Sequence, residues 1–268
     1  MRLTVDHVTR YHYNQAARSV VQSHRLSPSI FAGQKVIDWE VTVSGGTRGA
    51  AFRDGAGDEV QGWTVAGPVS ELAVRVQGTV ETVDLTGILR GHKETVAPNC
   101  YMRATTPTRA DAALEALARR AAAPDQLTLA HALSELVADA IAYRPGVTHA
   151  HTTAAEGLAL GEGVCQDHAH ALIAVARVRG MPGRYVSGYL FADADGLLHE
   201  AAHAWAEVHI SGLGWVGFDP ANRCCPDDRY IRLGSGFDAQ DAAPIRGIAR
   251  GGGREEMDVT VAVQQASQ

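Results

Sequence analysis

The stretch EGVCQDHAHALIAVARVRG, residues 162–180, raises the central question about this sequence. A single cysteine, Cys165, stands where a helical pattern of apolar residues begins. We predict a helix over residues 164–180, because Gly180 is a suitable C-terminal cap and Pro182 follows it. A cysteine at the start of such a helix can be a packed core residue, a metal ligand or a nucleophile.

The beginning of this helix is a favourable place for a nucleophilic thiol. Glycines at positions 161 and 163 let the backbone bend sharply before Cys165. The free N–H groups and the positive end of the helix dipole point at the first turn, which favours thiolate over thiol. The same N–H groups can serve as an oxyanion hole once the sulfur attacks a carbonyl. A nucleophile also needs a base, and the base needs an orienting acceptor.

Both of these groups are available further along the chain. The segment EAAHAWAEVHI puts His203 on a predicted strand, and GLGWVGFDP puts Asp219 at the end of the next strand. A short turn over residues 211–214 predicts a hairpin between these two strands. If the position opposite Asp219 is an even number of residues from His203, both side chains lie on one face of the sheet. The periodicity does not fix the register, but it is compatible with a Cys–His–Asp site.

The remaining sequence predicts an α+β protein with two regions. RLTVDHVTRYHY, KVIDWEVTV and SELAVRVQGTVETV alternate apolar and polar residues, as half-buried strands do. Helical patterns follow, then strands, and the tail EEMDVTVAV alternates as a final strand. We therefore divide the chain into a β-rich N-terminal domain, residues 1–98, and a catalytic domain, residues 99–268.

The overall composition limits the partners and the compartment. The net charge of −6 disfavours binding to nucleic acid or to an anionic membrane. No stretch reaches the roughly 20 apolar residues of a membrane span, and the first residues lack the apolar core of a signal peptide. We expect a cytoplasmic protein whose cysteines are free thiols. Nothing in the sequence indicates its oligomeric state.

Three blocks of the sequence carry a resemblance to a known family. TTAAEGLALGEGVCQDHAHALIAVARVRGMPGRYVSGYL, AHAWAEVHISGLGWVGFDP and RYIRLGSGFDAQDAAPIRGIARGGG resemble the bacterial transglutaminase-like superfamily. The N-terminal region resembles the β-rich domain that precedes the catalytic core in this family. The resemblance implies a papain-like core, with helices packed on an antiparallel sheet. It also implies that Cys165 is the nucleophile, His203 the general base and acid, and Asp219 the residue that orients the imidazole.

This resemblance implies acyl transfer from an amide or peptide bond through a thioester. Water as acceptor makes the protein a peptidase or amidase acting on a peptide or protein, which is the reading that we favour. The alternatives are a protein-glutamine amine transferase, that is, a cross-linking transglutaminase, and a non-enzymatic binding module on the same fold. The intact catalytic positions argue against a binding module. No cofactor and no metal are expected, since the sequence contains no EF-hand-like loop.

One histidine leaves part of the site open. His168 follows Cys165 by one helical turn, so it could form a metal-binding pair with the thiol or replace His203 as base. It also stands where the family often has an aromatic residue, which affects fine specificity rather than chemistry. Packing is the simplest role for the nearby aromatic residues. The candidate substrate-binding or supporting residues are Gly163, Val164, Gln166, Asp167, Trp205, Trp215, Tyr143 and Tyr189.

Overall fold

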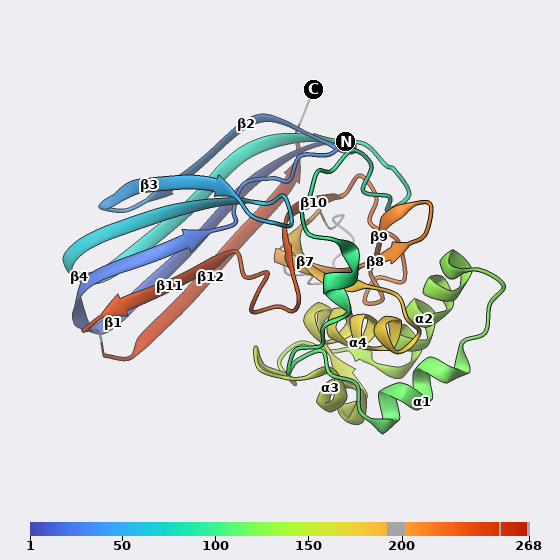
Figure 1. Cartoon of the computed structure of the whole chain (residues 1–268). Helices are drawn as coiled ribbons and strands as arrows, with labels where there is room; N and C mark the ends of the chain where they lie inside the picture. The colour runs from blue at the N-terminus through green and yellow to red at the C-terminus, as the bar shows by residue number, and fades with distance from the viewer. Residues whose placement is uncertain (192–201, 252, 267–268) are drawn as a thin grey trace.

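The computed structural model describes residues 1–191, 202–251 and 253–266. Long curved strands form one part of the molecule, and helices packed on a smaller sheet form the other (Figure 1). None of the described helices is long and apolar enough to cross a membrane. Glu200 and Ala201, which precede the predicted strand in the segment quoted for His203, lie outside the described residues.

The first sheet is antiparallel and has its core on one face. Alternate residues of its two longest strands are buried, including Leu3 and Val5 of one strand and Val74 and Val76 of the other, as the period of two predicts. Its strands are β1 (Arg2–His24), β2 (Gln34–Val43), β3 (Gly46–Arg53), β4 (Glu59–Thr82), β11 (Ile245–Arg250) and β12 (Glu255–Gln265).

The last two strands of the chain join this first sheet. Both β11 and β12 pair with β1 in antiparallel register, for example Val5 with Val263. The alternating tail is therefore a strand, as predicted, but its partner is the N-terminal strand. A division of the chain at residue 98 assigns these strands to the catalytic domain, whereas their hydrogen bonds belong to the N-terminal sheet.

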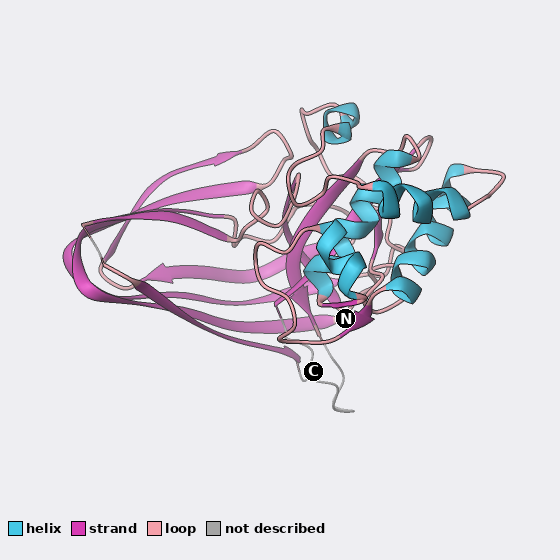
Figure 2. Cartoon of the chain, turned by 90° about the horizontal axis from the view of Figure 1, so that it is seen from below, coloured by secondary structure: helices cyan, strands magenta, loops and turns pink. Residues whose placement is uncertain are grey.

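The second part is a papain-like layer of helices on a four-stranded antiparallel sheet. Figure 2 shows the helices gathered at one end of the molecule, with the long strands extending from the other side. The sheet has the order β10-β7-β8-β9. Its strands are β7 (Gly183–Leu190), β8 (Ala202–Ile210), β9 (Gly214–Phe218) and β10 (Tyr230–Gly236). The smaller elements are η1 (Pro98–Met102), α1 (Ala112–Arg120), α2 (Gln126–Ala140), α3 (Ala154–Leu160), β5 (Ala142–Tyr143) and β6 (Glu162–Gly163).

The central helix is α4 (Cys165–Val178), which begins within one residue of the predicted position. It is buried on all sides from Asp167 to Arg177, because α1, α2 and α3 cover it and β7 and β8 lie beneath it. Gly180 has a φ of +75°, the left-handed conformation expected of a residue that terminates a helix. The buried helix fixes the position of Cys165, its first residue.

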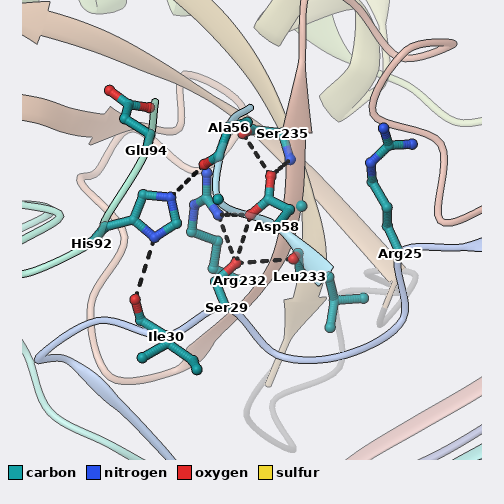
Figure 3. Close-up of polar contacts among 12 residues, drawn as sticks. Arg25, Ser29, Ile30, Ala56, Asp58, His92, Glu94, Arg232, Leu233 and Ser235 are labelled. Atoms are coloured by element: carbon teal, nitrogen blue, oxygen red, sulfur yellow. Dashed lines mark hydrogen bonds and ion pairs between the residues drawn. The ribbon is translucent and has the colours of Figure 1, made fainter. Parts of the chain in front are cut away.

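A buried ionic network joins the two parts (Figure 3). Asp58 lies in the turn before β4, and its carboxylate accepts from Nη1 of Arg232 on β10 at 2.7 Å. Arg232 also donates to Glu207 on β8 at 2.8 Å, and Glu207 accepts from Arg184 on β7 at 2.6 Å. The network therefore holds the face of the second sheet that also carries His203.

Candidate active site

The start of α4 and the hairpin of β8 and β9 bring Cys165, His203 and Asp219 together. Cys165 is the first residue of α4, His203 lies on β8, and Asp219 directly follows β9. In this hairpin Ala206 is opposite Phe218 and Glu207 is opposite Gly217. That register places Asp219 across from Trp205, on the same face as His203. The even offset expected from the sequence is therefore present.

His203 is hydrogen-bonded to Asp219 and lies close to Cys165. Its Nε2 lies 2.7 Å from Oδ2 of Asp219, and the side chain of Cys165 is near enough to raise the pKa of the ring. Because Nε2 faces the carboxylate, Nδ1 is the ring nitrogen left for the sulfur. His203 and Asp219 are 5% and 0% exposed, whereas Cys165 is partly exposed. A substrate can thus reach the sulfur while the base and its acceptor stay shielded from water.

The charges of these groups stabilise one another. Burial by itself would lower the pKa of His203, but the hydrogen bond to Asp219, the side chain of Cys165 and their negative charges raise it to about 10. For Asp219, burial by itself would raise the pKa, but the hydrogen bond from His203 keeps the pKa below its usual value. An imidazolium at His203 beside an ionised Asp219 is therefore the favoured charge state of this pair.

Two further residues, which sequence reasoning missed, hold Asp219 in place. The side-chain amide of Asn222 donates to Oδ2 of Asp219 at 2.7 Å and lies 3.2 Å from Nε2 of His203. The hydroxyl of Tyr230, on β10, donates to the same Oδ2 at 2.8 Å. Three donors thus converge on one carboxylate oxygen. The only sequence signal for Asn222 was its position in the turn after Asp219.

Trp205 covers one side of the His203 ring. Its indole stacks with the ring of His203 at a centroid distance of 6.5 Å and an interplanar angle of 26°. It also meets Tyr230 edge to face at 5.5 Å. Trp205 is 2% exposed, so it excludes water from one side of the imidazole. Trp205, a supporting candidate from the sequence, therefore packs against His203.

The residues around Cys165 shape the helix start. The carboxylate of Asp167 accepts from the N–H of Val164 at 2.8 Å and from the hydroxyl of Thr148 at 2.6 Å, which caps α4. A side chain at Gly163 would collide with this carboxylate, because its Cβ would lie 2.7 Å from Oδ2. The amide of Gln166 donates to backbone carbonyls of the preceding loop at 3.4 Å.

His168 does not face the thiol. Its Nδ1 lies 2.9 Å from the carbonyl of Val164, and its Nε2 lies 2.8 Å from the carbonyl of Ile141. With both ring nitrogens directed at backbone oxygens, His168 is available neither as a base nor as a metal ligand. Among the residues that the structure describes, no three His, Cys, Asp or Glu side chains are grouped to hold a metal ion.

Three aromatic candidates lie away from the catalytic groups. The hydroxyl of Tyr189 bonds to Nδ1 of His7 at 2.7 Å inside the first sheet's core. Trp215 donates to Glu94 at 2.6 Å at the far end of β9. The ring of Tyr143 lies 6.4 Å from that of His168. These contacts place Tyr189 against the first sheet and Trp215 beside the segment that follows β4.

Comparison with known proteins gives consistent matches. Residues 115–220 match the model of the transglutaminase-like superfamily, and residues 3–81 match the bacterial transglutaminase-like N-terminal region. The first match contains all three candidate catalytic residues. It confirms the resemblance seen in the sequence.

Individual relatives extend these matches. The chain is 31% identical to the uncharacterized protein ML0607 of Mycobacterium leprae, over 98% of both chains. It is 43% identical over 115 residues to an uncharacterized protein of Mycobacterium tuberculosis H37Rv, a match that spans 37% of that protein. The fold is also similar to a solved structure described as a "Putative Cysteine Protease from Cytophaga hutchinsonii". The match covers 100% of this chain and 91% of that protein's chain, with a TM-score of 0.77 and 20% identity. At that identity the similarity supports the fold.

Proposed function

Because the chain belongs to the transglutaminase-like superfamily, we propose that it is a cysteine-dependent hydrolase of amide or peptide bonds. One observation carries this proposal: His203 is hydrogen-bonded to Asp219 at 2.7 Å and lies near enough to the side chain of Cys165 for that group to raise the pKa of the ring. The proposed substrate is a peptide or protein. The predicted location of the enzyme is the cytoplasm.

The first half of the reaction forms a thioester. The thiolate of Cys165 attacks the carbonyl carbon, so a C–S bond forms and the carbonyl electrons move to oxygen. The N–H groups of Cys165 and Gln166, the first two of α4, have no carbonyl within the helix to donate to and are suited to hold this oxyanion. The C–N bond then breaks, and the imidazolium of His203 gives its proton to the leaving amine.

The second half releases the acyl group. Neutral His203 takes a proton from water, the resulting hydroxide attacks the thioester, and the C–S bond breaks to regenerate the thiolate and the imidazolium. The partial exposure of Cys165 lets water reach the thioester, which favours hydrolysis over transfer to an amine. Asp219 keeps the ring in position throughout and stabilises its positive charge.

We expect hydrolysis products when the protein is incubated with a mixed peptide library. In H₂¹⁸O the new carboxyl termini will carry ¹⁸O, which mass spectrometry detects, and Cys165→Ser will give none. A fluorescent primary amine in the same mixture distinguishes the alternative, since amine transfer would attach it to glutamine side chains. If wild type and Cys165→Ser give identical mixtures, the proposed function is wrong.

The rate should also decline at high pH. We expect kcat/KM to fall as pH rises through about 10, because the raised pKa of His203 keeps its ring protonated up to that value. Loss of this proton removes both the partner of the thiolate and the acid for the leaving amine. A decline centred near pH 7, measured with a peptide substrate found in the library, would contradict this ion pair.

The same proton contributes to stability with a definite sign. A folded-state pKa of about 10, above the usual 6.5, adds stability that is complete below about pH 6.5. This contribution is lost as pH rises through about 10.

A further inference from the structure

A short segment between the two parts of the molecule, residues 87–89, pairs with the outer edge of β9. The sheet order places β8 on one side of β9. On the other side the N–H of Gly217 donates to the carbonyl of Gly87 at 2.9 Å, and an antiparallel bridge joins Ile88 to Val216. Residues 87–89, which we call the strap, therefore extend the second sheet beyond β9.

The strap lies against both ends of the turn that carries Asp219. Two backbone hydrogen bonds between Asp219 and Cys224, at 2.8 and 3.2 Å, close this turn. Gly217 precedes the turn and Cys225 follows it. A Cβ at position 87 would lie 2.9 Å from the carbonyl oxygen of Gly217 and 3.0 Å from Cβ of Cys225. Gly87 thus packs against both ends of the turn at a distance that only glycine permits.

The backbone that leads into the strap has a conformation that few residues adopt. Thr86 has a φ of +52° and Gly87 a φ of +78°, so two consecutive residues are left-handed. The carboxylate of Asp84 accepts from the N–H of Thr86 at 2.7 Å, which stabilises this bend. A threonine stays in such a conformation only where the surrounding structure holds it there. The position of the strap is therefore fixed from both of its sides.

The turn after β9 determines where the carboxylate of Asp219 lies. Its Oδ2 is 2.7 Å from Nε2 of His203, and Asn222, in the same turn, donates to this oxygen at 2.7 Å. Such hydrogen bonds hold only over a narrow range of about 2.7–3.2 Å between the heavy atoms. A displacement of the turn would therefore weaken the contact that orients the imidazole.

We propose that Gly87 is a positioning residue for the reaction, which acts on His203 through β9 and the turn that carries Asp219. The strap fixes the turn, the turn fixes the carboxylate, and the carboxylate orients the ring that transfers the proton. This proposal rests on the proposed function, because it takes His203 and Asp219 to act in the reaction.

The test compares Gly87→Ala with Gly91→Ala. Both glycines lie in the same connection, with φ of +78° and +81°, so alanine strains the backbone similarly at each. The nearest atom to an added Cβ is 3.9 Å away at position 91, whereas at position 87 the methyl group pushes on the turn. We expect Gly87→Ala to lower kcat at least about tenfold, with little change in KM, on a peptide found in the library. Gly91→Ala should keep the wild-type kcat.

The titration of the His203 ring separates positioning from general damage. Burial lowers the pKa of this ring, but the hydrogen bond to Asp219 and the nearby Cys165 raise it to about 10. Tyr230 is the third titratable group beside the ring. A weaker bond to Asp219 should lower the midpoint by about one pH unit in Gly87→Ala and leave it unchanged in Gly91→Ala. NMR of histidine-labelled protein follows the midpoint, and the His203 signal is the one missing from His203→Ala.

Ile88→Ala keeps the test valid if alanine at position 87 prevents folding. Ile88 packs against the core of the second part, so its truncation loosens the strap without adding a clash and should shift the midpoint in the same direction. Midpoints and kcat equal to the wild type in these strap variants would overturn the proposal, and so would the same losses in Gly91→Ala. The proposed function is tested separately, since it fails if wild type and Cys165→Ser give the same peptide products, whatever the strap variants do.

Discussion

Replacing His203 with alanine is expected to remove the preferential alkylation of Cys165. In the wild type at pH 6, the imidazolium stabilises a thiolate at Cys165, so iodoacetamide should modify this residue first. Without the ring this stabilisation disappears, and Cys165 should react no faster than the exposed Cys100. Peptide hydrolysis should fall by at least about 10⁴-fold, because the residues of such a site act as a unit. Alkylation is mapped by mass spectrometry from pH 5 to 9.

The other cysteines serve as internal references for this experiment. Burial raises the pKa of Cys225 to about 11 and also raises that of Cys224, so both should stay unmodified at pH 6. His209→Ala is the matched control, since His209 lies on the same strand but packs against Trp215. If Cys165 reacts equally fast in wild type and His203→Ala, the histidine does not activate the thiol.

The hairpin that carries His203 and Asp219 was predictable from the sequence because its information is local. Alternation in β8 and β9 and the short turn between them predict the hairpin, and the observed register places both side chains on one face. The helix start at Cys165 follows from equally local signals, the glycines before it and the cap after it. Asn222 and Tyr230 could not be found in this way. Tyr230 reaches Asp219 only through the pairing of β10 with β7, a register that no local pattern encodes.

The roles of the aromatic candidates also depended on the fold rather than on the sequence. Packing is the simplest role that the sequence suggests for Tyr189 and Trp215, and both are buried, but the sequence does not say against what they pack. Gly188 pairs with His203, so Tyr189 projects from the opposite face, toward the first sheet. The pairing of the tail with β1 has the same origin, because these strands are separated by more than 200 residues.

Asp58→Ala is expected to destabilise the whole protein, even though Asp58 lies outside the catalytic core. The substitution leaves the guanidinium of Arg232, which is 3% exposed, without one of its two carboxylate partners. It also removes the acceptor for the backbone N–H and the hydroxyl of Ser235. Breaking a buried pair in this way costs about 3–5 kcal/mol, which urea unfolding followed by circular dichroism will measure.

The comparison variants separate charge from general damage to the sheet. Asp58→Asn keeps the size of the side chain and some of its hydrogen bonds, so it should cost less than alanine. Asp258→Ala removes a carboxylate from an exposed pair with Arg10 on the same sheet and should leave the unfolding midpoint unchanged. An equal midpoint for Asp58→Ala and wild type would mean that the N-terminal sheet does not support the core through this network.

The expected loss has a consequence for catalysis. Glu207, the other partner of Arg232, projects from the same face of β8 as His203 and Trp205. When Asp58 is absent, the guanidinium of Arg232 can turn toward solvent or contact only Glu207. The sheet face that carries His203 then loses an ion pair that connects it to the N-terminal part of the chain. We therefore expect kcat to fall in Asp58→Ala at temperatures well below its unfolding midpoint, with the alkaline limb near pH 10 retained. An unchanged kcat in Asp58→Ala would mean that the N-terminal sheet does not help to position His203.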